Sequence, residues 1–548
     1  MRSFAETAER IAATTSKLEK VRLLAEYLQG LDETRVGVAA RFFSGLIFPT
    51  WDMRVLSVGG ALLWDVLRGL SGATAEEMSA AWTRHGDAGG AAHDVLLRAC
   101  AAAPGVDVLD VVHTFEDIAS APSTAARTQL LDALLRRCTP LEAKYVVKLI
   151  TGEMRIGLRE GLVEEAIALA FGRDKAAVSR ADMVIGDLGE VALLARLDRL
   201  GEAAPRLFAP MRFMLASPVA DAAEVVQRMG EEVWVEDKYD GIRCQVHRDD
   251  SRVMLFSRDL KDVTAQFPEV AEAAAALPGI LLLDGEVLAF REGQVMPFAA
   301  LQTRLGRKAP SLAVLQRVPV IFVAWDLLYQ DGVSLLDEPL RERRKRLDAL
   351  QLGGALATAH QEHARGAQAV DTLFDNARAR RNEGLIAKDP DSAYTPGRRG
   401  LAWLKLKKPL DTLDVVVTGA ELGHGKRRDV LSDVTFSVRV DGSDELVPIG
   451  KAYTGLTDAE IAEMTELLTS ITVSEHGRFR VVRPEIVLEV AFDRVQPSSR
   501  HRSGYALRFP RIARWRHDKP VSEIDTLSRV AALARTSEGE RVQLVDRA

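Results

Sequence analysis

The residues best suited to covalent chemistry stand in segment 233–246, which reads VWVEDKYDGIRCQV. Apolar and polar residues alternate on both sides of Asp240-Gly241, and this pattern predicts two short strands joined by a tight hairpin turn. Lys238 stands just before the turn. Because lysine avoids burial unless its amine is used, a lysine inside a half-buried hairpin is a candidate nucleophile.

A lysine must be neutral when it attacks, so the pKa of Lys238 would have to fall from the ordinary value of about 10.4. Nearby cations and partial desolvation both lower a lysine pKa. Arg243 lies on the same predicted hairpin, Arg258 follows it, and Lys405 and Lys407 come later in the chain. The pattern Lys-x-Asp-Gly alone fits a surface lysine beside a turn at least as well, so the interpretation depends on these later residues.

Transfer of a nucleotidyl group to lysine needs cations around the attacked phosphate and carboxylates for a divalent metal. In segment 403–407, which reads WLKLK, strict alternation places Lys405 and Lys407 on one face of a strand and the two leucines on the other. Glu286 lies inside a predicted buried strand, and Glu383 just before another. We expect these two carboxylates to bind Mg²⁺ directly or through water.

Further residues are suited to holding the base and the sugar. Trp325 can stack on a base, and Glu236 can accept a hydrogen bond from an exocyclic amine. Arg243 and Arg258 can hold ribose or phosphate oxygens, and Arg399 lies close upstream of the two lysines. Each of these residues also has a structural explanation when taken alone, as a core aromatic, a strand-edge acid or part of a solvated strand face.

The elements that position these residues fall into three regions. Residues 1–205 are rich in Ala and Leu and lack strand-like runs, which predicts an all-α domain. Residues 206–409 mix short strands with helices and predict an α+β domain. Residues 410–548 read mostly as β-structure, and about five short strands with one helix suit a small Greek-key barrel such as an OB-fold.

The helical region carries one turn of interest. Thr139 opens a capping box with Pro140 at the first helical position, which predicts a helix that ends at Gly152. The following turn, 153–161, holds two arginines and two glycines and is suited to presenting N–H and guanidinium groups to phosphates. An ordinary helix–helix connection explains the same composition.

The last region ends in a basic segment. Segment 508–519 interleaves arginines and a lysine with aromatic residues, a composition suited to phosphate contacts. Before it, a helix capped by Thr457 is predicted among several strands. The predicted strands are 413–418, 434–440, 447–453 and 486–492.

Composition favours folded domains without a membrane segment. The chain has 548 residues, of which 47% are hydrophobic and 27% charged, and it contains no apolar run long enough to span a bilayer. The net charge of −6 means that binding to nucleic acid must rely on local basic patches. Cys100, Cys138 and Cys244 lie far apart, which excludes a zinc ribbon or a disulfide framework and fits a reducing cytoplasm.

In order and approximate spacing, these segments resemble the motifs of the covalent nucleotidyltransferases, and specifically of the ATP-dependent DNA ligases. Segment 149–157 also resembles the helical DNA-binding domain of the larger archaeal and eukaryotic-type ligases. One departure is Trp325-Asp326, because motif IIIa usually begins with Phe-Asp. The segments that look like motifs I, Ia, III, IIIa, IV, V and VI are 238–243, 256–259, 283–286, 324–329, 383–388, 403–407 and 508–519.

The resemblance implies a helical DNA-binding domain, an adenylation domain and an OB-fold domain that together perform three steps. Lys238 would take AMP from ATP and release pyrophosphate, the AMP would move to the 5′-phosphate of a nick, and the 3′-hydroxyl would displace it. ATP and Mg²⁺ are the implied cofactors, and nicked double-stranded DNA is the implied partner. We expect a monomer with no membrane association, and no sequence signal selects a sliding-clamp partner.

The resemblance further implies a moving C-terminal domain. Motif VI would approach the β- and γ-phosphates of ATP in a closed form and turn away later, with Pro409-Leu410 as the hinge. The helical domain would grip the duplex mainly through its phosphates. The motif VI cations are Arg508, Arg511, Arg514, Arg516 and Lys519.

Three alternatives stay open at this point. An mRNA capping enzyme or an RNA ligase shares motif I but does not usually carry so large a helical domain. An NAD-dependent ligase would normally bring a four-cysteine zinc site, whereas this chain has three cysteines. A non-catalytic DNA clamp with the same fold would have no use for a lysine nucleophile in a charged pocket.

Overall fold

The computed structural model describes residues 1–97, 99, 103–307, 309–380, 382–407, 411–423, 427 and 430–542, with side chains described as far as residue 535. The chain folds into two compact units, Met1–Lys407 and Lys408–Ala548. The predicted hinge at Pro409-Leu410 lies outside the described residues. Within the described part of the chain, no helix combines the length and the hydrophobicity needed to cross a membrane.

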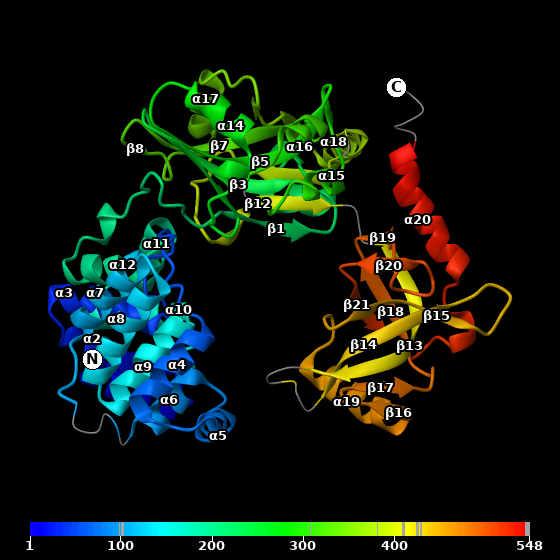
Figure 1. Cartoon of the computed structure of the whole chain (residues 1–548). Coiled ribbons are helices and arrows are strands. Elements are labelled where there is room, and N and C mark those ends of the chain that lie inside the picture. The colour runs from blue at the N-terminus through cyan, green and yellow to red at the C-terminus, as the bar shows by residue number, and fades with distance from the viewer. Residues whose placement is uncertain are drawn as a thin grey trace. The chain divides into compact units, whose positions relative to one another are not determined.

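The first unit begins with an all-helical region, as predicted (Figure 1). Its ninth helix starts with the expected capping box at Thr139 and ends at Gly152, whose φ of +69° suits glycine. The helices are α1 Arg2–Ala13, α2 Lys17–Gln29, α3 Glu33–Phe43, α4 Gly60–Ser71, α5 Ala75–His85, α6 Ala88–Leu96, α7 Val108–Ser120, α8 Thr124–Arg137, α9 Pro140–Thr151, α10 Glu160–Phe171, α11 Lys175–Ile185 and α12 Leu188–Arg196.

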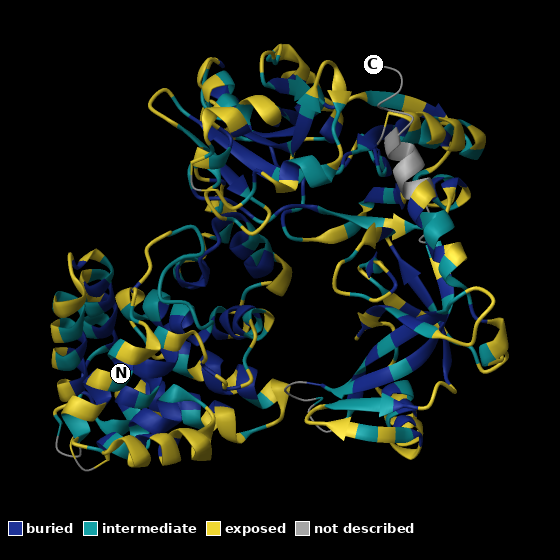
Figure 2. Cartoon of the chain, turned by 45° about the vertical axis from the view of Figure 1, so that its right-hand side comes forward, coloured by how far each residue is buried: buried dark blue, intermediate teal, exposed yellow. Residues whose placement is uncertain are grey.

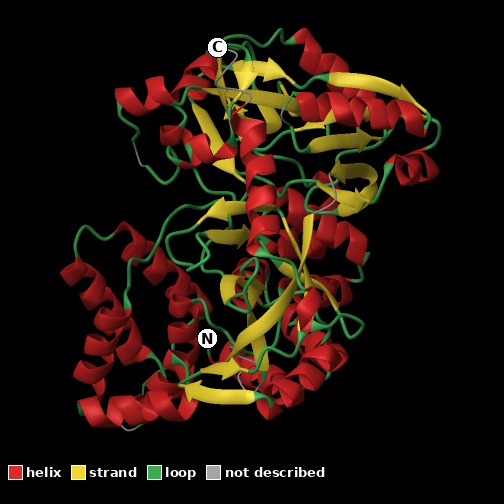
Figure 3. Cartoon of the chain, turned by 90° about the vertical axis from the view of Figure 1, so that its right-hand side faces the viewer, coloured by secondary structure: helices red, strands yellow, loops and turns green. Residues whose placement is uncertain are grey.

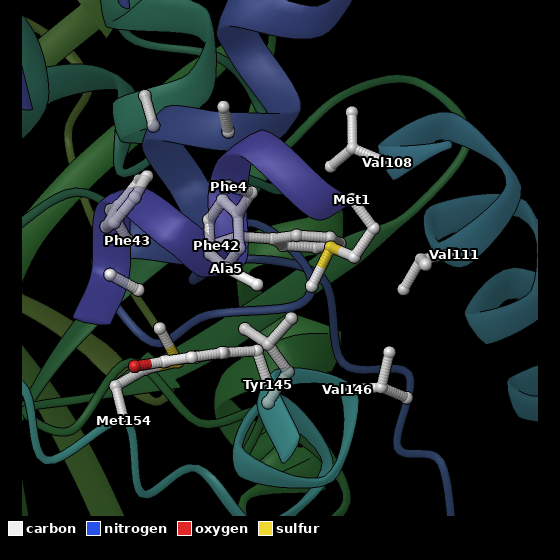
Figure 4. Close-up of a cluster of buried hydrophobic side chains, with 14 of the residues drawn as sticks. Met1, Phe4, Ala5, Phe42, Phe43, Val108, Val111, Tyr145, Val146 and Met154 are labelled. Atoms are coloured by element: carbon white, nitrogen blue, oxygen red, sulfur yellow. The ribbon is translucent and has the colours of Figure 1, made fainter. Parts of the chain in front are cut away.

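Aromatic side chains form the centre of this helical region (Figure 4). The ring centroids of Phe4 and Phe43 lie 4.3 Å apart, and Phe4 meets Phe42 and Tyr145 edge to face. All four side chains are almost completely buried. Helices α1, α3 and α9, which lie far apart along the chain, therefore share one core.

The rest of the first unit contains two sheets flanked by helices (Figure 3). One sheet has the strand order β1-β12-β11-β2-β10, and the other β4-β3-β5-β7-β8 with β6 and β9 at its margins. The strands are β1 Leu215–Val219, β2 Glu232–Lys238, β3 Ile242–Arg248, β4 Val253–Ser257, β5 Leu281–Arg291, β6 Gln294–Val295, β7 Val320–Gln330, β8 Val333–Ser334, β9 Leu356–Thr358, β10 Gln361–Arg365, β11 Gly384–Lys388 and β12 Arg399–Lys407. The helices are α13 Ala222–Met229, α14 Pro268–Ala275, α15 Phe298–Gln302, α16 Leu312–Arg317, α17 Leu340–Ala349 and α18 Ala367–Ala379.

The predicted hairpin around Asp240-Gly241 is wrong. Strand β2 pairs with β10 and β11, whereas β3 pairs with β4 and β5, so the two predicted partners belong to different sheets. Alternation of apolar and polar residues predicts a strand but not its neighbour. The segment between β2 and β3 is therefore a crossing from one sheet to the other.

The second unit is rich in β-structure, as predicted. Its main sheet has the order β15-β14-β13-β17-β16, and β18 joins β13 to β21. The predicted helix after Thr457 is α19, and the sequence reading missed β16, β17, β19, β20, β21 and the last helix. The elements are β13 Asp411–Leu422, β14 Leu431–Arg439, β15 Leu446–Ala452, α19 Asp458–Ser470, β16 Thr472–His476, β17 Phe479–Val482, β18 Val487–Phe492, β19 Arg494–Pro497, β20 Tyr505–Arg508, β21 Arg511–Trp515 and α20 Leu527–Val542.

A buried ion pair fastens α17 to the sheet that contains β7. The guanidinium of Arg343 donates to both carboxylate oxygens of Asp326 at 2.7 and 2.9 Å, and neither side chain is exposed to solvent. Arg343 also donates to the carbonyl of Ser392 at 3.0 Å. Figure 2 shows buried residues along many of the strands.

We predict that Arg343→Ala lowers the free energy of unfolding by about 3–5 kcal/mol, because Asp326 is then buried without its partner. Urea denaturation followed by tryptophan fluorescence measures the change. The exposed neighbour Lys345→Ala is the control and should shift stability by less than about 0.5 kcal/mol. The paired change Arg343→Met with Asp326→Leu should recover most of the loss, and a loss equal to that of Arg343→Ala would contradict this account.

Candidate active site

A cavity of about 450 Å³ lies where the two sheets of the first unit face each other, and both sheets contribute to its lining. It gathers every residue that the sequence predicted for nucleotide and metal binding in this unit. These residues are Glu236, Lys238, Arg243, Arg258, Glu286, Trp325, Glu383, Arg399, Lys405 and Lys407.

The crossing between the sheets positions the candidate nucleophile. Lys238 is the last residue of β2 and pairs with Gly384 of β11, whereas Arg243 of β3 already pairs with Glu286 of β5. Gly241 sits so close to β5 that a Cβ atom there would lie 2.4 Å from the carbonyl oxygen of Val287. Glycine is required at this position by close packing and not by a turn conformation.

One carboxylate joins two lysines of the cavity. Oε2 of Glu383 lies 2.5 Å from Nζ of Lys238 and 2.5 Å from Nζ of Lys407. Burial alone would raise the pKa of Glu383, but the charges and hydrogen bonds of the two lysines hold it below its usual range. Glu383 is therefore an anion that fixes the amine of Lys238 at the cavity wall.

A second group of cations carries positive charge that protein carboxylates do not neutralise. Within the described residues, no ion pair involves Arg258, Arg399 or Lys405. Burial lowers the pKa of the Lys405 amine, and the nearby charges of Arg399, Lys407, Lys238 and Arg258 lower it further. The alternation predicted for β12 is confirmed, since Leu404 and Leu406 are buried on the opposite face. This wall suits phosphate oxygens.

The second predicted metal ligand lies on β5. Glu286 accepts a hydrogen bond from the backbone N–H of Gly241 at 3.1 Å. Burial raises its pKa to about 7, although Lys238 and Arg243 act in the opposite direction. Glu286 and Glu383 both line the cavity, so two carboxylates face the space that the cations surround.

Arg243 is held by protein groups. Its guanidinium donates to Asp284 at 2.6 and 3.1 Å and to the carbonyl of Met214 at 2.7 Å. The hydroxyl of Tyr394 also donates to Asp284, at 2.8 Å. These bonds orient Arg243 along the cavity lining, where it lies over the rings of Phe213 and Trp325.

The far end of the cavity combines aromatic rings with a buried ion pair that the sequence reading missed. Nζ of Lys388 lies 2.6 Å from Oε2 of Glu236, and Arg344 approaches the other oxygen of Glu236 at 3.4 Å. Lys388 also lies over the rings of Trp325 and Trp403. Alternation along β11 could have indicated Lys388, which lines the cavity together with Ile386; Arg344 comes from α17 and has no such signal.

The predicted motif VI cations belong to the second unit. Arg508 ends β20 and lies 3.7 Å from Asp493, and Arg514 on β21 pairs with Glu489 at 3.2 Å. The remaining ones differ in exposure and partners. Arg511 is exposed, and Arg516 and Lys519 both pair with Asp414, at 3.0 and 2.7 Å.

A buried lysine binds the backbone of the turn that follows α9. Nζ of Lys20 donates to the carbonyls of Ile156 and Ile11 at 2.6 and 2.7 Å. Arg155 and Arg159 are exposed on this turn. Arg155 pairs with Glu153 at 2.5 Å and donates to the carbonyl of Gly86. The turn thus presents two guanidinium groups on a fixed backbone.

Three family models match the chain in succession. "DNA ligase N terminus" matches residues 1–168, "ATP dependent DNA ligase domain" residues 213–407, and "ATP dependent DNA ligase C terminal region" residues 427–519. A probable DNA ligase of Koribacter versatilis is 47% identical and covers 100% of this chain and 99% of its own length. The DNA ligase of Archaeoglobus fulgidus is 38% identical, with 97% of each chain covered.

A solved structure named Pmar-Lig_PreS3 resembles the whole fold. It covers 94% of this chain and 99% of its own, with a TM-score of 0.56 and 17% sequence identity. At this identity the likeness concerns the fold. A helical region, a two-sheet region and a β-rich unit therefore also occur in a chain of distant sequence.

We predict that Glu286→Gln changes how stability depends on pH. Because burial raises the pKa of Glu286 from 4.5 to about 7, the folded state holds this proton more tightly than the unfolded state. The stability that Glu286 contributes by holding this proton is fully present below the pKa that the group has in the unfolded chain. It is lost as pH rises through about 7. Without divalent metal, the free energy of unfolding of the wild type should therefore fall, relative to that of the variant, by on the order of 3 kcal/mol between pH 5 and pH 8.

Denaturation in EDTA across this pH range measures the difference. The exposed Glu272→Gln serves as the matched control and should follow the wild type. A gap between wild type and Glu286→Gln that stays constant with pH would contradict the prediction.

Proposed function

The chain belongs to the ATP-dependent DNA ligase family, and from that premise we propose that Lys238 is the residue that receives AMP. The observation that carries the proposal is the position of Lys238, which ends β2 inside the cavity beside Glu383 and the cationic wall. A lysine there has an anion to accept its proton and cations to receive a phosphate. Both are needed for attack on the α-phosphate of ATP.

In the first step, Nζ of Lys238 forms a bond to the α-phosphorus while the bond to pyrophosphate breaks. The amine must release a proton, and Glu383 at 2.5 Å is the nearest acceptor. Lys405, Arg258 and Arg399 would neutralise the charge that builds up on the α-phosphate oxygens. The motif VI cations of the second unit would take the departing β- and γ-phosphates.

The next two steps first move AMP onto the DNA end and then join the strand. A 5′-phosphate oxygen of a nick attacks the lysine-bound AMP, the P–N bond breaks, and the lysine recovers its proton. The 3′-hydroxyl then attacks the 5′-phosphate, loses its proton, and expels AMP as the strand is joined. Each transfer exchanges one phosphorus bond for another, so positioning and charge neutralisation can supply most of the rate.

Glu286 and Glu383 would hold Mg²⁺ together with substrate phosphates. Among the described residues, no group of three or more potential metal ligands gathers. Two carboxylates beside a phosphate site fit Mg²⁺, which is usually bound by one or two carboxylates plus substrate phosphates. When bound, Mg²⁺ would withdraw charge from the phosphate oxygens.

Glu236 would select adenine. Lys388 and Arg344 fix its carboxylate in a buried position, where it can accept a hydrogen bond from the exocyclic amine of adenine but meets a carbonyl oxygen in guanine. The carbonyl oxygen of guanine and this buried carboxylate are both acceptors, and facing each other without a donor they make the wrong base costly. Trp325 would stack on the base. Arg243 would hold neighbouring residues of the cavity lining in position.

The helical region would grip the duplex on both sides of the nick. Arg155 and Arg159 are exposed on a fixed turn, and guanidinium groups bind phosphates without reading sequence. Binding of this kind weakens steeply with salt. We propose a monomeric enzyme that meets nicked duplex DNA through these contacts.

We predict that Lys238→Ala abolishes covalent labelling by α-labelled ATP, because the amine that forms the P–N bond is gone. A denaturing gel of protein incubated with labelled ATP and Mg²⁺ provides the measurement, and binding to nicked DNA should persist. The exposed Lys261→Ala is the matched control and should label normally. Persistent labelling or sealing by Lys238→Ala would remove Lys238 from the mechanism.

We predict that Lys405→Ala slows self-adenylation by about 10²-fold or more, because one fixed cation is lost from the phosphate site. The rate of labelling at saturating ATP measures the change. Affinity for nicked DNA should stay near that of the wild type, and Lys345→Ala should match the wild type in both assays. If Lys405→Ala weakened DNA binding alone, Lys405 would belong to the duplex surface instead.

A further inference from the structure

The linker between the helical region and β1 is fixed along its length to strand β3. Residues 207–214, which lead to β1, run without helix. Alternate residues of β3, at positions 243, 245 and 247, each bond to the linker backbone. Because alternate residues of a strand share one face, the linker is hydrogen-bonded to one face of β3.

Gln245 and His247 supply side-chain hydrogen bonds from β3 to the linker backbone. Gln245 accepts from the backbone N–H of Met211 at 3.2 Å and donates to its carbonyl at 2.7 Å. The N–H of Phe208 donates to Nδ1 of His247 at 3.0 Å. Nε2 of His247 then carries the proton and donates to Gln245 at 3.2 Å.

These bonds lie in a dry environment. Gln245 and His247 have no exposed surface, and burial lowers the pKa of His247 to about 3, which keeps its ring neutral. A buried polar group that loses its partner carries an unrecovered desolvation cost. The linker backbone therefore cannot leave β3 without leaving several buried groups unpaired.

The other side of the linker bonds to the helical region. The N–H of Arg212 donates to the carbonyl of Met183 at 3.2 Å, and its guanidinium pairs with Glu160 at the start of α10. Phe208, Met211 and Met214 bond to β3, whereas Arg212 between them bonds to the helices. The linker is thus bonded on both sides.

The end of the linker runs directly into the cavity. Met214 is followed by Leu215 and Ala216, which line the cavity on β1. The carbonyl of Met214 accepts from Arg243. Arg243 thus keeps the end of the linker at the cavity, whereas the bonds of Gln245 and His247 hold the part of the linker that leads to the helical region.

We propose that Gln245 and His247 are positioning residues for nick sealing. They contact neither nucleotide nor DNA in the mechanism above. They hold the linker, so that the nick in the DNA bound by the helical region stays correctly positioned relative to Lys238. The inference rests on the proposed roles of Lys238 and of the helical region. It concerns the steps that use DNA and not the reaction with ATP.

The test uses the full chain with Gln245→Met, which keeps the side-chain length and removes the hydrogen bonds, and with His247→Leu. Both variants should self-adenylate at the wild-type rate. Pre-adenylated protein should seal nicked DNA about 10- to 100-fold more slowly at saturating DNA, because misplacement of reacting groups by about an ångström costs that much. The DNA concentration at half-maximal rate should stay unchanged.

His247→Asn should restore sealing, because its side chain keeps an acceptor near the position of Nδ1. Trypsin should cut at Arg206 or Arg212 faster in Gln245→Met and His247→Leu than in the wild type. Gln29→Met is the matched control, since Gln29 bonds to a backbone carbonyl inside the helical region at 2.8 Å and does not touch the linker.

Sealing at the wild-type rate would overturn the proposal, and so would a loss of self-adenylation in step with sealing. Slow sealing without faster linker cleavage would overturn it as well, because the two residues would then act without holding the linker. Wild-type protein that fails to label at Lys238 would count against the proposed function and not against the linker.

Discussion

The passage of the chain from one sheet to the other, between Lys238 and Ile242, is the constraint on which the cavity depends. Gly241 lies against β5 with no room for a Cβ atom, and its N–H bonds to Glu286. This contact fixes the crossing segment against β5, just after the point where Lys238 ends its strand. The positions of the nucleophile and of both candidate metal ligands therefore depend on this one short segment of backbone.

Charge distribution in the cavity follows from the same arrangement. β11 pairs with β2 on one side and with β12 on the other, so Glu383, just before β11, and Lys407, on β12, reach Lys238 from the same sheet. One anion is shared by two lysines at 2.5 Å each, while Lys405, Arg258 and Arg399 keep their positive charge for a ligand. At the other end, Glu236 is held by Lys388 and Arg344. The cavity thus offers a cationic end for phosphates and a carboxylate with aromatic rings for a base.

Residue type and spacing predicted which side chains gather in the cavity, but not how the chain brings them there. The alternation in β12 correctly separated Lys405 from Leu404. The hairpin was wrong because the neighbours of β2 are β10 and β11, which lie more than a hundred residues further along the chain, and local alternation carries no information on distant pairing. Asp284 and Arg344 were missed for a related reason, since their partners Arg243 and Glu236 lie 41 and 108 residues away along the chain. Short exposed strands such as β16 lack the apolar alternation that would have predicted them.

Peptide mapping of the adenylated protein by mass spectrometry tests the central claim most directly. The cavity contains four lysines, Lys238, Lys388, Lys405 and Lys407. Protein incubated with ATP and Mg²⁺ should carry AMP on the peptide that contains Lys238 and on no other cavity lysine. AMP found on Lys388, Lys405 or Lys407 would contradict this claim, because the crossing between the sheets would then position something other than the nucleophile.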